Sequence, residues 1–324
     1  MIPILVTGGA GYIGAHTCKL LSQNGYLPIV YDNLSTGHLY AVKWGPLIQA
    51  DLADKDALNA VFEKFSPKAV IHFAADAIVM ESMQNPAKYY RNNVAGTIQL
   101  LETMVAHKVP KIVFSSTCAT YGNPLQTPIT EEHPQNPINP YGRSKWMVEQ
   151  ILKDFTKAYG LEAVILRYFN AAGADRDGEI GENHSPETHL IPTIIEARLG
   201  KRDTVVIYGK DFDSKDGTAV RDYIHVEDLA RAHVSALRCK GSETVNLGTG
   251  RGYSVLEIVQ AVERYCGVGI KIEYKGRREG EPGILTADFG KAKKILGWEP
   301  KCDLKMIVAS AWKWHKSLCE YAHT

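Results

Sequence analysis

The sequence predicts an α/β fold in which a doubly wound parallel sheet is covered by helices on both faces. Short β-branched runs alternate with longer helical patterns through the first half of the chain. These runs are continuously apolar, as expected for strands that are buried on both faces. A glycine-rich turn directly follows the first run and opens the first helical pattern.

The elements of the first half follow from apolar periodicity and from terminal signals. We expect strands at 2–6, 28–32, 69–73 and 111–115, and helices at 12–24, 54–65 and from about 86 to 107. In the first helix Ile13, Leu20 and Leu21 share one face, and Gly25 is a stop signal. Asp54 suits the N-cap of the second helix.

After about residue 169 the pattern is less regular. Residues 170–188 are polar and rich in glycine, which favours a loop or lid over a packed element. Helical patterns return at 190–199, 227–239, 254–266 and 304–319. We therefore expect one domain over 1–169 and a smaller α/β part over 170–324, with some of the chain crossing back to the first.

Charge and composition exclude several classes of partner. The formal net charge is +1, with 45% hydrophobic and 23% charged residues, so no global field favours nucleic acid or a membrane surface. Residues 1–6 begin directly in an apolar run that has no basic region and is too short for a signal peptide or membrane span. A cytoplasmic protein is expected.

Cysteine and histidine spacing gives no sign of a metal. The six cysteines are scattered without a CxxC pair, which is typical of reduced thiols. The eleven histidines show no HExxH pattern, and none pairs with a cysteine at zinc-finger spacing, so we predict no metal. His72, inside the apolar run 70–73, is expected to be a core histidine.

A cofactor loop is predicted where the first strand meets the first helix. Residues 7–14 read Thr-Gly-Gly-Ala-Gly-Tyr-Ile-Gly. Glycines permit a tight turn and let backbone N–H groups approach a pyrophosphate, while the helix N-terminus adds partial positive charge. Gly14 permits close packing of the helix on the strand. This combination indicates a Rossmann-like dinucleotide site.

Asp32 favours NAD as the dinucleotide. It ends the second strand, 18 residues after Gly14, where a carboxylate accepts hydrogen bonds from the adenosine ribose and repels a 2′-phosphate. The alternative is a turn aspartate beside an unrelated glycine loop. Asp51 suits either a position near the adenine or a helix cap. On this reading 1–169 is the NAD-binding domain and 170–324 mainly binds substrate.

Catalytic residues are predicted at the start of a helix that Pro140 opens. Tyr141 and Lys145 are four residues apart, so they share one helix face. They follow a strand that carries Thr117 at its carboxyl end, where sites form in open α/β sheets. Tyr141 would act as a general base on a sugar hydroxyl that Thr117 orients. The alternative is an ordinary helix face and a strand-end threonine.

The electrostatic requirement of this arrangement can be sized. A tyrosine pKa near 10 must fall by roughly 3 units to give appreciable phenolate at neutral pH, which requires about 4 kcal/mol. One positive charge about 5 Å away supplies on the order of 3 kcal/mol at an effective dielectric of 20. The sequence therefore assigns the shift jointly to Lys145 and a nicotinamide cation.

With these features the chain resembles the extended short-chain dehydrogenase/reductase family and, within it, the UDP-glucose (UDP-galactose) 4-epimerases of galactose metabolism. The resemblance covers essentially the whole length. It rests on TGGAGYIG (7–14), YDNLSTG (31–37), HFAA (72–75), RNNVAGT (91–97), SSTCATYG (115–122), PYGRSK (140–145), RYFNAAG (167–173), GTAVRDYIHV (217–226) and RREG (277–280).

The resemblance implies the site residues. Bound NAD would contact Gly8, Gly11, Tyr12, Ile13, Gly14, Asp32, Asn33, Asp51, Leu52, Phe73, Ala74, Ala75, Asn92, Tyr141, Lys145 and Phe169. The UDP-sugar would contact Thr117, Tyr141, Asn170, Leu190, Val206, Ile207, Tyr208, Arg221, Arg278 and Leu285, with the two arginines on the diphosphate. The implied reaction interconverts UDP-glucose and UDP-galactose through a transient 4-keto sugar. A homodimer is implied, built from helices around 92–107 and 144–159.

Departures from the family pattern keep alternatives open. Many relatives have serine in place of Thr117, and some have lysine near Asp76-Ala77. Leu285 occupies the position that gates bulky 2-substituents, so a UDP-N-acetylglucosamine 4-epimerase or a dual-specificity enzyme is the alternative. Related dehydratases and decarboxylases carry carboxylates where this chain has Cys118-Ala119. A non-catalytic NAD-binding regulator would have lost Tyr141, Lys145 or the hydroxyl, and this chain keeps all three.

Overall fold

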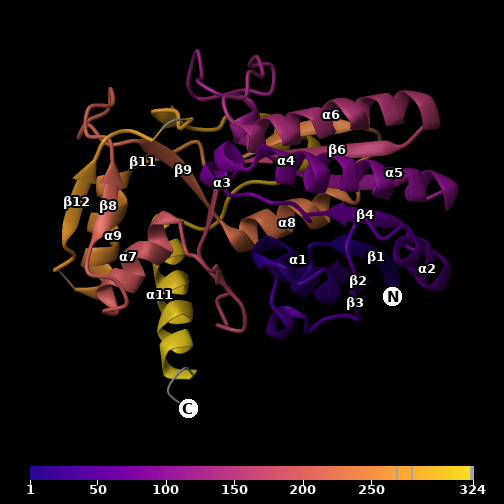
Figure 1. Cartoon of the computed structure of the whole chain (residues 1–324), viewed down its shortest axis with the longest axis horizontal. Coiled ribbons are helices and arrows are strands. Elements are labelled where there is room, and N and C mark those ends of the chain that lie inside the picture. Colours follow the sequence, from indigo (N-terminus) through magenta and orange to yellow (C-terminus); the bar gives the residue numbers. More distant parts are fainter. Residues whose placement is uncertain (268, 279, 322–324) are drawn as a thin grey trace.

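The computed structural model describes residues 1–267, 269–278 and 280–321. Its larger body is built on one seven-stranded sheet, part of which is labelled in Figure 1. The strand order is β10-β6-β5-β4-β1-β2-β3, and every neighbouring pair is parallel. The strands are β1 (Ile2–Thr7), β2 (Tyr26–Asp32), β3 (Leu47–Gln49), β4 (Ala69–His72), β5 (Lys111–Thr117), β6 (Glu162–Tyr168) and β10 (Glu243–Leu247). The predicted doubly wound fold is confirmed.

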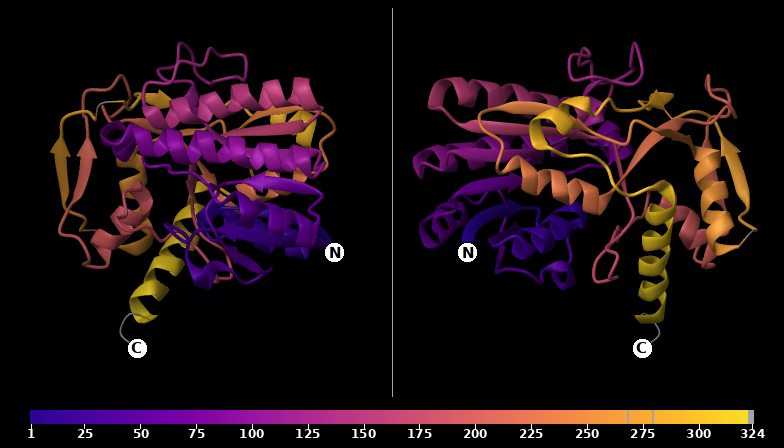
Figure 2. Two further views of the ribbon diagram at one scale, coloured as in Figure 1. Left: turned by 45° about the vertical axis from the view of Figure 1, so that its right-hand side comes forward. Right: turned by 180° about the vertical axis from the view of Figure 1, so that it is seen from behind.

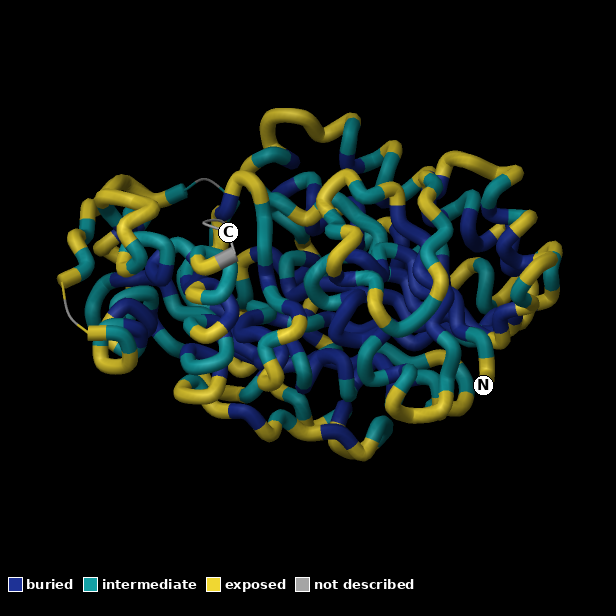
Figure 3. Tube along the Cα trace, turned by 90° about the horizontal axis from the view of Figure 1, so that it is seen from below, coloured by how far each residue is buried: buried dark blue, intermediate teal, exposed yellow. Residues whose placement is uncertain are grey.

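Helices cover both faces of this sheet, and the alternation of side chains along β1 shows how. Ile4 and Val6 pack in one apolar cluster with Leu21 of α1 (Tyr12–Gln23) and with α8 (Val226–Ala236). Leu5 points the other way, into the cluster formed with α2 (Lys55–Phe65), α5 (Gly96–Ala106) and α6 (Pro140–Tyr159). Buried segments accordingly run through the interior of the molecule in Figure 3.

The segment predicted as one helix over 86–107 has an irregular centre. It consists of α4 (Pro86–Tyr89), a π-helical turn η2 (Tyr90–Ala95) and α5, and the short α3 (Val79–Gln84) precedes it. Such π turns are frequent at functional sites. Here the turn carries Asn92 and Asn93, and the Asn93 side chain donates to Ser144 Oγ on α6 at 3.0 Å.

The smaller body contains two short sheets. In one, β9 (Val220–His225) pairs with β7 (Asn170–Ala172), β11 (Gly252–Ser254) and β13 (Ile284–Leu285). In the other, β8 (Val205–Tyr208) pairs with β12 (Ile272–Lys275). The helices of this body are α7 (Leu190–Arg198), α9 (Val255–Cys266) and α11 (Leu304–Tyr321), and α11 projects with the C-terminus in both views of Figure 2.

Several local predictions are confirmed and a few boundaries move. The Asp54 side chain accepts from Ala57 N and caps α2. β2 begins at Tyr26 rather than residue 28; Pro28 is tolerated inside it because β3 pairs only from Val30 onward. α8 ends at Ala236 rather than 239, and α10 (Gly290–Leu296) follows β13. Two 3₁₀ turns, η1 (Leu39–Ala41) and η3 (Cys118–Thr120), were not predicted.

The expectation of a loop over 170–188 holds for the backbone after residue 172, but the segment is packed against the rest of the chain. Residues 170–172 form β7, and Ala174 bridges Gly181. Polar side chains within the segment are buried, among them Asp175 at 3% exposure and Glu182 at 4%. Composition misled here because the buried carboxylates find partners only in the folded chain. In the part of the chain that the structure describes, no helix is long and apolar enough to cross a bilayer.

Candidate functional site

The predicted cofactor and catalytic residues lie around the carboxyl edge of the large sheet. Because all seven strands are parallel, the residues that follow β1, β4, β5 and β6 emerge at the same edge. Gly8 follows β1, Phe73 follows β4, Thr117 ends β5 and Phe169 follows β6. The sheet therefore brings together four stretches that lie far apart in the sequence.

The glycine turn after β1 has the geometry of an anion cradle. Gly8 has φ +71°, and a Cβ there would lie 2.6 Å from the backbone N of Ala74; a Cβ on Gly14 would lie 2.1 Å from the Gly8 carbonyl oxygen. The N-cap of α1 is Gly11, which offers no side-chain cap. The first N–H groups of α1 are therefore left for a ligand, and a pyrophosphate fits the turn.

Asp32 lies beside this turn and fits a ribose. Its Oδ2 accepts from Ala10 N at 3.0 Å and its Oδ1 from Leu34 N at 2.8 Å. Each oxygen keeps a further lone pair that can accept from a hydroxyl. Burial raises the pKa of Asp32, although the two backbone N–H groups oppose that shift. A neutral ribose diol is therefore a better partner for this 8%-exposed carboxylate than a phosphate.

Asn33 and Asp51 are brought together next to Asp32. Asn33 Nδ2 donates to Asp51 Oδ2 at 2.7 Å, and Ala53 N donates to Asp51 Oδ1 at 2.9 Å. Asp51 therefore caps the turn that precedes α2, whereas Asp54 is the N-cap of the helix itself. A position beside the adenine remains open to Asp51 because its side chain is exposed.

The remaining predicted cofactor residues lie around the same edge. The backbone N–H groups of Phe73 and Ala74 both donate to the Thr7 carbonyl at 2.9 and 3.1 Å. Leu52 and Phe169 are buried, and Ala75 and Ile13 are half-buried. Asn92 Nδ2 donates to Asp76 Oδ2 at 3.0 Å, and Lys88 pairs with the same carboxylate at 3.0 Å. Lys88 of α4 thus places its ammonium group beside Asp76, the region in which some relatives carry a lysine.

Tyr12 turns its side chain away from the turn. Its hydroxyl donates to the Gly173 carbonyl at 2.6 Å, which ties the first helix to the segment that follows β7. Any contact of Tyr12 with a ligand in the glycine turn is therefore left to its backbone N–H.

The predicted catalytic residues meet at the start of α6. Asn139 is the N-cap and accepts from Gly142 N at 2.8 Å, and Pro140 is the first helical residue. Tyr141 and Lys145 project from the buried face at 8% and 4% exposure. Tyr141 lies beside the side chain of Thr117 at the end of β5, and this neighbour acts to lower the pKa of Tyr141. Lys145 Nζ donates to the Ser115 carbonyl at 2.9 Å and lies 4.9 Å from the centre of the Phe114 ring.

The protein's own groups do not produce the pKa shift that the sequence-based argument assigned to Tyr141. Burial raises the pKa of Tyr141 well above 10, and only the Thr117 side chain is seen to lower it. Burial also lowers the pKa of Lys145 from 10.5 to about 7, although Glu149 opposes that shift. The full ammonium charge assumed from sequence is therefore reduced by desolvation at neutral pH. A second positive charge is needed to stabilise a phenolate.

The residues after β5 carry no acid or base. Cys118 is buried, and burial raises the pKa of its thiol to about 12. Ala119 offers no ionisable group. Cys118 packs with Tyr121, Phe169 and Leu285 in one small apolar cluster. The predicted gate residue Leu285 thus lies against the strand end that carries Thr117.

Apart from Thr117 and Tyr141, the predicted substrate residues belong to the smaller body. Along β8 Val206 and Tyr208 are half-buried, whereas the Ile207 side chain belongs to the core and leaves only its backbone for a ligand. The Arg278 guanidinium lies 3.7 Å from the centre of the Tyr208 ring. Arg221 Nη1 donates to the carbonyls of Val220 and Gly283.

The other two predicted substrate residues open elements of this body. Asn170 begins β7 and Leu190 begins α7, and both are half-buried. Glu279, inside the predicted arginine motif 277–280, lies outside the described residues.

Sequence reasoning missed a buried ion pair next to Lys145. Arg167 Nη2 lies 2.6 Å from Glu149 Oε2, with side-chain exposures of 4% and 0%, and Ser116 Oγ donates to Glu149 Oε1. Glu149 follows Lys145 by four residues, as Lys145 follows Tyr141. Polar residues repeating every four positions on a buried helix face are the signal that could have found it.

Sequence reasoning also missed a second polar group, because its members are spaced irregularly along 182–189. Glu182, His184, Glu187 and His189 converge only in the folded chain. His72 behaves as predicted. It bonds Thr7 and Thr97 in the core, and burial lowers its pKa to about 3.

Comparison with known proteins places this geometry among nucleotide-sugar enzymes. A family model described as GDP-mannose 4,6 dehydratase matches residues 5–311. A UDP-glucose 4-epimerase of Rhizobium meliloti (strain 1021) is 54% identical over 316 residues, 96% of each chain. A crystal structure of UDP-glucose 4-epimerase from Brucella ovis in complex with NAD is 52% identical, with a TM-score of 0.93 over 96% of this chain and 98% of that one. The enzyme from Stenotrophomonas maltophila, with NAD and formylated UDP-arabinopyranose, is 38% identical, with a TM-score of 0.96 over 99% and 100%.

Proposed function

The chain belongs to the UDP-glucose 4-epimerases of the extended short-chain dehydrogenase/reductase family, and from that premise we propose how its site acts. It is an NAD-dependent isomerase that interconverts UDP-glucose and UDP-galactose. The observation that carries the mechanism is the meeting of Tyr141 and Thr117 at the carboxyl end of β5, beside an uncapped glycine turn.

The residues after β5 support epimerisation over elimination. Dehydration or decarboxylation needs an acid or base there to move a proton on carbon. Cys118 holds its proton because burial raises its pKa to about 12, and Ala119 has none. These two residues therefore do not support the dehydratase activity named in the description of the matching family model.

The glycine turn and its neighbours hold the cofactor. The N–H groups at the start of α1 face the pyrophosphate, Asp32 takes the adenosine ribose, and Phe73 and Phe169 flank the path along the sheet edge. When bound, NAD supplies a reversible hydride acceptor and a positive ring. The domain boundary at 169 is part of this proposal, with the reservation that β10 of the second part joins the first sheet.

The proton of the reacting hydroxyl is moved by this chain's own residues. Tyr141 accepts it from O4 of the sugar, and Thr117 orients that hydroxyl through its contact with the phenol. Lys145 holds partial positive charge beneath them, anchored on the Ser115 carbonyl. After the 4-keto sugar has turned over and presents its opposite face, the same groups return the proton to its O4.

The smaller body anchors the nucleotide and limits the sugar. Arg221 and Arg278 bind the diphosphate, with Val206, Tyr208 and the Ile207 backbone along the uracil, and Asn170 and Leu190 border the sugar. Anchoring at a distance lets the sugar turn over without release. Leu285 is buried against Phe169 and Cys118. Its side chain is therefore expected to restrict the space for a 2-acetamido group on the sugar more than a smaller residue at this position would.

The proposal extends to a cytoplasmic homodimer. Apolar side chains on α5 and α6 that are half-exposed or exposed in the single chain, namely Ile98, Met147 and Ile151, support packing of these helices against a second copy. Cys18, Cys118, Cys239, Cys266 and Cys302 are free thiols, as suits a reducing compartment. Sedimentation at micromolar concentration that gives only monomer would remove the dimer.

The experiment is a coupled assay with UDP-galactose and no added NAD. The purified chain is expected to turn over, and Tyr141→Phe should lower kcat by about 10²- to 10⁴-fold while NAD remains bound. Tyr159→Phe, at the exposed end of the same helix, is the matched control and should leave kcat unchanged. Near-normal turnover by Tyr141→Phe would remove this residue from the mechanism.

A further inference from the structure

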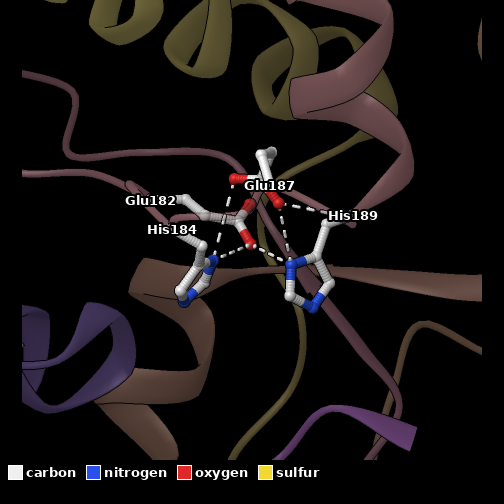
Figure 4. Close-up of side chains that lie close together, drawn as sticks. All are labelled: Glu182, His184, Glu187 and His189. Atoms are coloured by element: carbon white, nitrogen blue, oxygen red, sulfur yellow. Dashed lines mark hydrogen bonds and ion pairs between the residues drawn. The ribbon is translucent and has the colours of Figure 1, made fainter. Parts of the chain in front are cut away.

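Two histidines and two glutamates converge beside the glycine turn, outside the site described above. His189 Nδ1 lies 2.8 Å from Glu182 Oε1 and 3.2 Å from Glu187 Oε1. His184 Nδ1 lies 3.3 Å from Glu182 Oε1 and 3.7 Å from Glu187 Oε2. Figure 4 shows both rings turning Nδ1 toward the carboxylates and Nε2 away from them.

The two carboxylates are buried, and one oxygen of Glu187 receives no hydrogen bond. Glu182 is 4% exposed and Glu187 is 6% exposed. Glu187 Oε2 and His184 Nδ1 are both buried and form no hydrogen bond, and their contact with each other is a long ion pair of 3.7 Å. A buried carboxylate oxygen without a donor is costly to keep, so these atoms point to a missing cation.

The neighbouring group of carboxylates, Asp175, Asp177 and Glu179, differs because it already has a lysine as its positive partner. Lys19 Nζ lies 2.9 Å from Asp175 and 2.9 Å from Asp177, and it also pairs with Glu179. Within the described ranges, neither Lys nor Arg forms an ion pair with Glu182 or Glu187. The positive partner of this pair of glutamates is therefore left to the imidazoles or to an external ion.

The spacing of the four ligand atoms fits a small tetrahedral ion. Ligands bound at about 2.0–2.1 Å in a tetrahedron lie about 3.3 Å from one another. Glu182 Oε1 lies 2.8 Å from His189 Nδ1 and 3.3 Å from His184 Nδ1, and His184 Nδ1 lies 3.7 Å from Glu187 Oε2. Imidazole nitrogen and carboxylate oxygen are ligands that Zn²⁺ accepts, whereas Ca²⁺ and Mg²⁺ prefer oxygen alone.

The backbone holds this group in place before any ion binds. Glu187 Oε1 accepts from the N–H groups of Thr188 and His189 at 2.8 and 2.9 Å, which leaves Oε2 directed to the centre. Trp314 Nε1 donates to the Glu182 carbonyl at 2.8 Å, and Arg202 Nη2 donates to the Glu187 carbonyl at 2.8 Å. Hydrogen bonds from groups that do not themselves touch the metal help to hold metal ligands in place in proteins.

Contrary to the expectation from histidine and cysteine spacing that the chain binds no metal, we propose that Glu182, His184, Glu187 and His189 bind one divalent transition-metal ion of the Zn²⁺ type, as a structural site. Four protein ligands leave no open position for chemistry. The His184 ring stands edge-on to the Tyr12 ring at 6.5 Å, and Tyr12 is the residue after Gly11. All four ligands come from residues 182–189, so the ion would fix the loop before α7, and the His184 ring contact carries that loop against the start of α1. This inference does not rest on the proposed catalytic function.

The test counts metal on the full chain. The protein is treated with a chelator, exposed to Zn²⁺ and desalted, and its zinc content is measured by inductively coupled plasma mass spectrometry. We expect about one Zn²⁺ per chain for the wild type, and affinity at least tenfold lower for Glu187→Gln and for His189→Ala, measured by competition with a chromogenic chelator. Asp177→Asn, in the group held by Lys19, is the matched control and should bind as the wild type does.

Two further readouts keep the test decisive if a ligand variant does not fold. Co²⁺ added to the chelator-treated wild type should give the intense visible bands of a four-coordinate site, and Zn²⁺ should raise its Tm. Weak six-coordinate Co²⁺ bands, or less than a tenth of an equivalent of Zn²⁺ after desalting, would overturn the proposal. Equal retention by wild type, Glu187→Gln and Asp177→Asn would show an adventitious ion only, and would overturn it as well.

Discussion

Replacing Lys145 with methionine should separate stability from activity. Lys145 is 4% exposed and its ammonium donates to the Ser115 carbonyl, so a charged group is held in a largely apolar place beside Phe114. Methionine keeps a similar volume without the charge. We expect the variant to unfold less readily than the wild type near pH 6, while its turnover falls.

The magnitude follows from the shifted pKa. Burial lowers the pKa of Lys145 from 10.5 to about 7, and one pKa unit corresponds to about 1.4 kcal/mol. Below pH 7 the folded state carries the full penalty of about 5 kcal/mol, since the ammonium is charged in both states. Between pH 7 and 10.5 the unfolded chain binds a proton that the folded chain does not, so the stability of the wild type rises with pH. The gap to the variant should narrow by about 2–3 kcal/mol from pH 6 to pH 9.

The measurement is urea unfolding of both chains at several pH values, at equal NAD content. Lys153→Met, an exposed lysine on the same helix, is the control and should show no change in pH dependence relative to the wild type. A gap between wild type and Lys145→Met that stays constant from pH 6 to pH 9 would refute the argument. It would show that the ammonium is solvated in the folded chain.

Three further substitutions probe other parts of the site. Glu149→Gln leaves the Arg167 guanidinium buried without its counter-charge, so urea unfolding should show a loss of about 3–5 kcal/mol; a loss under 1 kcal/mol would contradict this. Leu285→Ala widens the apolar cluster, so kcat/KM for UDP-N-acetylgalactosamine should rise relative to UDP-galactose, and an unchanged ratio would remove Leu285 as the gate. Gly8→Ala would place a Cβ 2.6 Å from Ala74 N at positive φ, so NAD extracted per chain should fall; full NAD content would show that the turn can relax.

Local sequence determined the sheet and the cofactor turn. Continuous apolar runs predict the buried parallel strands. The glycines of 7–14 predict the cofactor turn, because Gly8 has a positive φ and Gly14 lies close to backbone atoms. The Tyr141 to Lys145 spacing placed both side chains on the buried face of α6. These features depend on neighbours within a few residues, which is why pattern reasoning reaches them.

Only the tertiary structure decided the electrostatics and the second polar group. Burial set the pKa of Lys145 near 7 and raised that of Tyr141, and the degree of burial depends on strands more than twenty residues away. The addition of β10 to the large sheet depends on pairing with β6 across about 80 residues. Glu182, His184, Glu187 and His189 seemed to belong to an exposed loop, but the two glutamates are buried and the four side chains converge. Trp314, far along the chain, and Arg202, outside the segment, donate to the backbone carbonyls of Glu182 and Glu187. Desolvation and long-range contacts have no local signature, so the sequence alone leaves them open.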